Sequence, residues 1–128
     1  MAFPSGPAAM IPGFLFPEST VHESGSGEPV EIGAGNGTVL LALGITEILE
    51  QQSLDVDVQG SVDGEEWMDE PLRAFPQKFY RGVWQILCDL DAVPDVRFVK
   101  VRYKVARWGV GEPTPTFKFY VFADRFDG

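Results

Sequence analysis

Apolar and charged residues alternate one by one along residues 96–107 of this 128-residue chain. Every second position is apolar and the positions between are basic: Val99, Val101, Tyr103 and Val105 against Lys100, Arg102 and Lys104. A repeat of two residues places successive side chains on opposite faces of a β-strand and does not fit a helix. The same alternation recurs in residues 54–62 and 116–124, and no convincing amphipathic helix follows Gln52. The sequence therefore predicts an all-β chain, folded as an antiparallel β-sandwich.

Two of the expected strands are apolar on both sides. In residues 83–89, Trp84 and Ile86 alternate with Val83 and Leu87, so both faces of this segment are expected to be covered. Residues 116–124 carry aromatic rings on both faces: Phe117, Phe119 and Val121 on one, Lys118, Tyr120 and Phe122 on the other. The second of these faces holds too much aromatic surface to be left in water.

Prolines interrupt the apolar segment of residues 1–17 and prevent it from forming a helix. This segment lacks the positively charged N-terminal region of a signal peptide, so the protein is expected to be made in the cytoplasm without one. Residues 18–37 become polar and rich in glycine, which is typical of a flexible connection. The sequence therefore predicts an extended N-terminal arm over residues 1–36 and a β-sandwich domain over residues 37–126.

Charge is divided by position along the chain. Residues 1–72 hold thirteen acids and none of the ten bases, whereas residues 73–128 hold six acids and all ten bases. The two halves are expected to pair, within one chain or between copies. The net charge of −9 disfavours nucleic acid and anionic membranes as partners. No run reaches the roughly 18 apolar residues needed to span a membrane.

The stretch Leu54–Trp67, LDVDVQGSVDGEEW, contains a strand, a Ser-x-Asp-Gly turn and a tryptophan. It resembles a pattern shared by discoidin-type jelly rolls and by small β-sandwich proteins of phage virions. Val96–Val101, VRFVKV, is similar to a later strand of those folds. Discoidin domains are usually longer and join their ends with a disulfide, which Cys88 as the only cysteine cannot form. The resemblance therefore implies the shorter, jelly-roll-like virion type, whose members serve as capsid, decoration, tail or tube components.

The N-terminal arm carries the main functional prediction, a structural protein that assembles with itself. Its apolar side chains need a surface to cover, and the glycine-rich connection allows them to reach a neighbouring subunit. The predicted interface residues are Phe3, Phe14, Leu15, Phe16, Lys100, Arg102, Lys104 and Trp108. The expected partners are further copies in a homo-oligomer or lattice, with a second virion protein as an additional candidate. The expected location is a virion or another extracellular assembly.

A carbohydrate-binding or adhesive module is the alternative from another class. The aromatic residues that would form a platform for sugar rings are Trp67, Trp84, Trp108, Tyr80 and Tyr103. Packing inside the sandwich is the competing interpretation for Trp84 and Tyr103, which occupy inward positions of strands. Trp108 opens a glycine-containing loop, where it is available for a ligand or a partner.

Enzymatic activity is the third alternative. Residues 30–37, VEIGAGNG, resemble the first motif of the S-adenosylmethionine-dependent methyltransferases, but that fold needs repeated strand–helix units that residues 54–124 do not offer. His22 is the only histidine, so a catalytic relay lacks a well-placed base. The sequence predicts no catalytic, cofactor-binding or metal site. Calcium binding by the acidic loop of residues 63–70 stays an open alternative. Asp55 and Asp57 are expected to pair with the basic strand.

Overall fold

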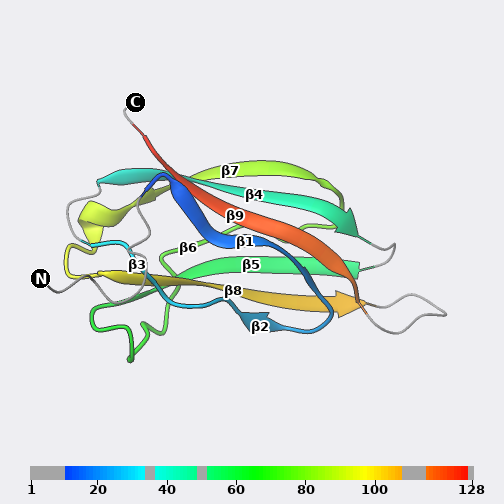
Figure 1. Ribbon diagram of the computed structural model, residues 1–128, viewed down its shortest axis with the longest axis horizontal. Helices are drawn as coiled ribbons and strands as arrows, with labels where there is room; N and C mark the ends of the chain where they lie inside the picture. Colours follow the sequence, from blue (N-terminus) through cyan, green and yellow to red (C-terminus); the bar gives the residue numbers. More distant parts are fainter. Residues whose placement is uncertain (1–10, 34–36, 49–51, 108–114, 127–128) are drawn as a thin grey trace, which may run out of the picture.

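The computed structural model describes residues 11–33, 37–48, 52–107 and 115–126. These residues form nine strands and one short 3-10 turn (Figure 1). The elements are β1 (Gly13–Val21), β2 (Gly25–Ser26), β3 (Val30–Glu31), β4 (Thr38–Ile48), β5 (Gln52–Ser61), β6 (Arg73–Ala74), β7 (Gly82–Asp89), η1 (Leu90–Ala92), β8 (Phe98–Arg107) and β9 (Phe117–Arg125).

The strands form two sheets in which every pair is antiparallel. Sheet A has the order β1-β9-β4-β7, and sheet B has the order β2-β8-β5-β6 with β3 also paired to β8. If β2 and β3 are taken as one interrupted strand, the pairs are nested: β1 with β9, β2 and β3 with β8, β4 with β7, and β5 with β6. This nesting is the topology of a jelly roll. The predicted antiparallel sandwich of jelly-roll type is confirmed. The parallel sheet of the methyltransferase-like alternative does not occur among the described strands.

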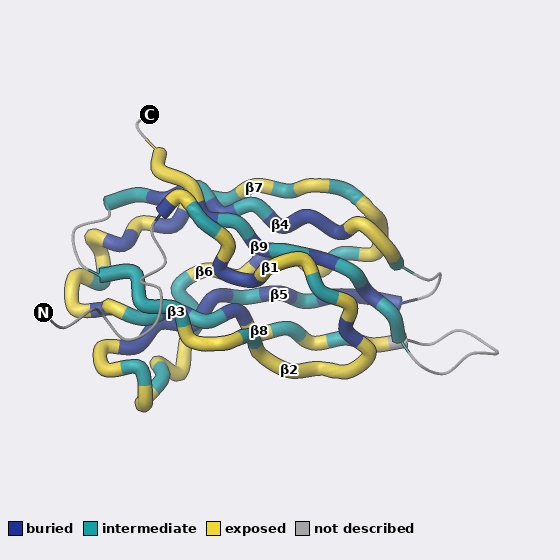
Figure 2. Tube along the Cα trace, in the orientation of Figure 1, coloured by how far each residue is buried: buried dark blue, intermediate teal, exposed yellow. Residues whose placement is uncertain are grey.

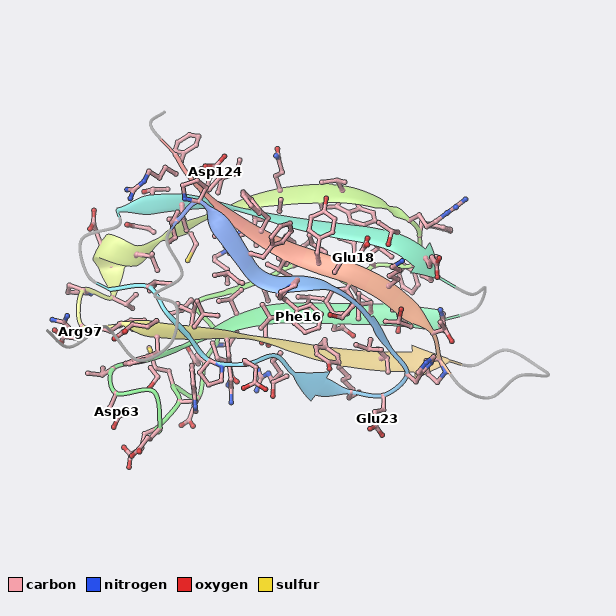
Figure 3. All side chains as sticks on the ribbon, in the orientation of Figure 1. Phe16, Glu18, Glu23, Asp63, Arg97 and Asp124 are labelled. Atoms are coloured by element: carbon pink, nitrogen blue, oxygen red, sulfur yellow. The ribbon has the colours of Figure 1, made fainter. Side chains whose placement is uncertain are left out.

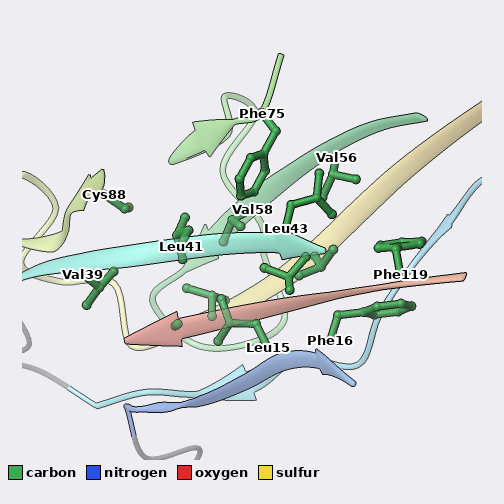
Figure 4. Packing of buried hydrophobic residues seen from close by; sticks show 14 of the residues in the cluster. Leu15, Phe16, Val39, Leu41, Leu43, Val56, Val58, Phe75, Cys88 and Phe119 are labelled. Atoms are coloured by element: carbon green, nitrogen blue, oxygen red, sulfur yellow. The ribbon is translucent and has the colours of Figure 1, made fainter. Parts of the chain in front are cut away.

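The core lies between the two sheets and is built from the inward positions of the alternating strands. Leu41 and Leu43 of β4 and Phe119 of β9 face Val56 of β5 across it, and all four are at most 2% exposed (Figure 4). Complete burial of such a side chain contributes about 1.5–3 kcal/mol. Cys88 of β7 is also buried, and burial raises the pKa of its thiol. The core is therefore formed by apolar packing, with Cys88 acting as a small hydrophobic residue.

Residues 13–21, which the sequence assigns to the arm, form β1 of sheet A. Leu15 and Phe16 are only 4% and 8% exposed. The ring of Phe16 stacks on that of Phe119 with the centroids 4.8 Å apart (Figure 4). Pro17 is tolerated because β1 is an edge strand, where a missing N–H need not break a ladder. The boundary at residue 36 therefore does not separate an arm from the sandwich. Leu15 and Phe16, which the sequence predicts as interface residues, are buried within their own chain.

Candidate functional site

The outer face of sheet B is charged, and its charges are matched within the chain. The register places Asp57 of β5 opposite Arg102 of β8 and Asp55 opposite Lys104. The Arg102 guanidinium donates to both carboxylate oxygens of Asp57, with Nη2 at 2.7 Å from Oδ2 and Nε at 3.1 Å from Oδ1. This hydrogen bonding raises the pKa of Arg102. The expected pairing of the acidic half with the basic half is thus confirmed at this pair, inside one chain.

Two further polar groups of this face also have partners in the same chain. The Nζ of Lys100 lies 4.4 Å from the centre of the Trp67 ring, and Gln77 donates to Asp55 at 3.0 Å. A shallow depression of about 760 Å³ runs over these strands between Ser26 and Phe75. In its lining, Arg102 bonds to Asp57 and Asp55 accepts from Gln77, which leaves Arg102 less suited to a neighbouring subunit than the sequence predicts. Lys100 is engaged by Trp67 in the same way, whereas Lys104 has no ion pair with a described residue.

The loop after β5 folds around the side chain of Asp63. Its Oδ1 accepts the backbone N–H groups of Glu65 and Glu66, each at 2.9 Å, and Ser61 Oγ accepts the N–H of Gly64 at 2.8 Å. The bonds from Glu66 and Glu65 hold the pKa of Asp63 below its usual range. The Ser-x-Asp-Gly stretch is thus a tight turn whose carboxylate is used by the backbone. Among the described residues, no three His, Cys, Asp or Glu side chains gather closely enough to hold a metal ion.

The aromatic residues suggested for a sugar platform do not come together on one surface. Lys100 covers the ring of Trp67, and Lys78 Nζ lies 4.5 Å from the ring centre of Trp84. Tyr103 packs inward, with its ring 5.4 Å from those of both Phe16 and Phe119. Tyr80 is exposed on the segment before β7. Trp108, like Phe3, lies outside the described residues.

The outer face of sheet A has the opposite character. Register pairs align its side chains in three rows across the strands. The rows are Val83–Gly44–Tyr120, Gln85–Ala42–Phe122–Phe14 and Leu87–Leu40–Asp124. Only the third row contains a charged residue. We call this surface the apolar face and define it by Phe14, Leu40, Ala42, Val83, Leu87, Tyr120 and Phe122.

An aromatic cluster occupies the part of the apolar face nearest to β1. The ring of Phe14 meets those of Phe122 and Tyr120 edge-on, with centroid distances of 5.0 and 5.7 Å. Gly44 provides the space for this arrangement, because a Cβ at this position would overlap the Tyr120 ring. Edge-to-face contacts of this kind stabilise a pair by about 0.5–1.5 kcal/mol beyond area burial. The cluster is therefore held in place before any partner arrives.

Large parts of the apolar face are open to solvent in the described chain. Val83, Phe14 and Leu87 are 61%, 50% and 40% exposed. Exposed and half-buried residues alternate along β7, at the upper edge of the molecule in Figure 2. Both faces of this segment were predicted to be covered, so the prediction is wrong for its outer face within one chain. Charged groups lie toward the ends of the apolar face, where Glu18 and Asp124 are labelled in Figure 3, and Gln85 is the polar member of the middle row.

Sequence reasoning identified part of this site. Phe14 was predicted as an interface residue, and it lies on the apolar face. The side chains of Tyr120 and Phe122 were recognised as too apolar to be left in water, but they were not assigned to an interface. Val83 and Leu87 were missed because their segment was expected to be covered from both sides. A strand that is apolar on both faces was the signal that could have found them.

No protein-family model matches this chain, and no curated protein sequence matches it. Within the described part of the chain, no helix is long and apolar enough to cross a membrane. The apolar face, which departs from an ordinary solvated surface in the described part of the chain, is therefore the candidate functional site.

Proposed function

We propose that this protein is a structural subunit that assembles with copies of itself through the apolar face of sheet A. The observation that carries the proposal is the row structure of this face, in which Phe14, Val83 and Leu87 are exposed beside a fixed aromatic cluster. An ordinary antiparallel sheet with one wet face alternates apolar and polar residues, as sheet B does. Sheet A instead has two apolar faces, which is typical of a sheet with another layer packed on each side.

The energy available supports association. Complete burial of a large apolar side chain contributes about 1.5–3 kcal/mol, and these residues are already partly covered. Two copies that each bury Phe14, Val83 and Leu87 would gain on the order of 6 kcal/mol from these side chains alone. That gain lies within the range of about 4–15 kcal/mol that association costs in lost motion. Tyr120, Phe122 and Leu40 would add to it, so the expected assembly is weak and reversible.

The fold gives a more specific form of this proposal by analogy. Jelly rolls recur in viral capsid proteins, and also in lectins and cupins, so the fold by itself does not select a role. The resemblance of Leu54–Trp67 and Val96–Val101 to small virion proteins favours a capsid, decoration, tail or tube component. Residues 13–21 of the predicted arm belong to the sandwich as β1, and they contribute Phe14 to the proposed interface.

Sedimentation velocity of the full chain tests the proposal with one variant and one matched control. Phe14→Glu places a charge inside the apolar face, whereas Val62→Glu changes an equally exposed apolar residue, 55% exposed, in the loop after β5. We expect the unmodified protein to form larger species than Phe14→Glu, and Val62→Glu to behave like the unmodified protein. Circular dichroism and urea unfolding establish that all three are folded. The proposal fails if the unmodified chain is a monomer or if Phe14→Glu assembles equally well.

A further inference from the structure

The two edges of sheet A are built differently. At one edge, β1 contains Pro17, and its pairing with β9 shifts register twice between Phe14 and Ser19. Proline and bulges are the features by which edge strands avoid pairing with other chains. At the other edge, β7 pairs with β4 over eight consecutive residues without a shift, and it contains neither proline nor lysine. The β7 edge therefore lacks the protection that the β1 edge has.

The hydrogen-bonding groups on the far side of β7 can be assigned from its contact with β4. The N–H of Leu90 donates to the carbonyl of Gly37 at 3.0 Å, which continues the β4–β7 ladder by one residue. Residues that bond to one neighbour alternate along an antiparallel strand. The even-numbered residues of β7 therefore bond to β4, and the backbone N–H and C=O groups of Val83, Gln85 and Leu87 point away from it. No described segment pairs with them, and β7 forms the upper margin of the sheet in Figure 1.

We infer that the β7 edge pairs antiparallel with the β7 edge of a second copy, with Gln85 opposite Gln85 across a twofold axis. In this register the outward-pointing backbone groups of Val83, Gln85 and Leu87 meet the same groups of the second copy. The register also places Arg81 opposite Asp89 of the second copy, and the twofold axis repeats that contact at the other end. The two sheets A then become one continuous sheet of eight strands.

Charge complementarity is the argument for a second copy as the occupant. Arg81 and Asp89 flank the strand symmetrically about Gln85, and both are exposed with no ion pair to a described residue. One oxygen of Asp89 accepts the N–H of Asp91 at 3.0 Å, which leaves the other oxygen available. A register shifted by two residues in either direction separates Arg81 from Asp89 of the second copy. The sequence of β7 thus selects one self-complementary alignment.

Apolar exposure is concentrated along the same edge. Phe79, Tyr80, Val83 and Leu87, all among the exposed large hydrophobic residues of the described chain, lie within nine consecutive residues. In the proposed register Val83 lies beside Leu87 of the second copy, so each covers the other on the outer face. Cross-strand pairs of this kind are the unit by which sheets are stabilised. The joined sheet would also extend the apolar face across both copies.

This inference shares with the proposed function only the identity of the partner, because it concerns the edge of sheet A and not its face. The two fail separately. Phe14→Glu lies on β1, at the opposite edge of the sheet, and leaves the β7 edge unchanged. A chain that forms only edge-paired dimers would contradict the proposed function and support this inference.

Mixing two charge-reversed variants tests the register. Arg81→Glu places Glu opposite Asp89 in a homodimer, and Asp89→Arg places Arg opposite Arg81, so each variant alone repels itself. A mixed dimer restores one opposite-charge pair at each end. Measured in the Phe14→Glu background by sedimentation equilibrium, each variant should raise the dimer Kd about tenfold or more, and the equimolar mixture should regain the parent value. Lys104→Glu, with the same change in net charge on the outer face of sheet B, should leave the Kd unchanged. The inference fails if the mixture associates no better than its components, or if Lys104→Glu weakens the dimer as much as Arg81→Glu.

Cysteine crosslinking gives a second readout that leaves Asp89 and its hydrogen bond from the Asp91 N–H unchanged. In the proposed register the residues at position 85 of the two copies face each other at the twofold axis. Their Cα atoms would lie within the separation of about 4.4–6.8 Å that a disulfide requires, so the two sulfurs of Gln85→Cys can bond. Under mild oxidation Gln85→Cys should become a covalent dimer, while Val83→Cys and Leu87→Cys should each remain uncrosslinked alone and crosslink with each other when mixed. Cys88 is buried and should not compete. Crosslinking of Val83→Cys alone at the rate of Gln85→Cys, or none at Gln85→Cys, overturns the register.

Discussion

The outer faces of sheets A and B lie on the same small sandwich but are built from opposite chemistry. On sheet B, acidic residues of β5 face basic residues of β8, and the Arg102–Asp57 pair closes within the chain. On sheet A, aromatic and aliphatic residues fill the corresponding positions, and Phe14 and Val83 remain exposed. The comparison teaches that folding pairs an acid of the first half with a base of the second half on sheet B, whereas it leaves apolar residues of sheet A exposed. The exposed apolar surface is therefore the one at which we propose that other copies pack.

The largest expected change in the free energy of unfolding concerns β1, the strand that supplies Phe14 to the apolar face. Phe16→Ala should destabilise the protein by about 3–5 kcal/mol, because it removes a buried ring stacked on Phe119. Phe14→Ala should cost about 1 kcal/mol, the value of its edge-on aromatic contacts. Urea unfolding measures both. Equal small losses would mean that β1 is not part of the sandwich, and the apolar face would then lose one of its four strands.

The charged face should respond much less. Asp57→Ala removes the carboxylate that holds Arg102, whose side chain is 45% exposed. Exposed ion pairs contribute about 0.2–1 kcal/mol after screening, so a loss near the upper end of that range is expected for this bidentate pair. The loss should shrink in about 1 M salt, where the screening length is about 3 Å. Asp55→Ala, which lacks a salt bridge within the described residues, is the control and should cost less. A loss as large as that of Phe16→Ala would place this face in the core.

The smallest effect is expected at Asp63, in the loop beside sheet B. Its pKa is lowered in the folded state, so its ionised form stabilises the fold above the unfolded pKa, and this contribution disappears as the pH falls through the folded pKa. Asp63→Asn should therefore lower the urea midpoint slightly at about pH 7 and have almost no effect near about pH 2.5. A difference that grows toward low pH would contradict the assigned hydrogen bonds.

Much of the sandwich was predictable because its strands follow a period of two. The alternation in residues 54–62, 83–89, 96–107 and 116–124 corresponds to β5, β7, β8 and β9. Local sequence specifies which face of such a strand turns inward, since the side chains alternate by geometry.

The strand β1 was not predictable in the same way. Its segment, GFLFPESTV, contains Pro17 and shifts register within the strand, so no regular period survives. Its structure is determined by β9, which lies about a hundred residues further along the chain.

The apolar face was predictable from the sequence only in part, for a related reason. An apolar residue is read from sequence as buried, and whether its own chain covers it depends on which strands lie at the sheet edges.

The nested pairing has a consequence for the order in which the molecule can form. Because β1 pairs with β9 and β4 lies between β9 and β7, sheet A cannot be completed on the ribosome until residues 117–125 have been synthesised. The loops that must close are long, and topologies dominated by such distant contacts fold slowly. During that interval the apolar residues of β1, β4 and β7 are in water together on an incomplete chain. Cells that make this protein rapidly would therefore need chaperones or low local concentrations, because premature contacts between growing chains would compete with the assembly of finished ones.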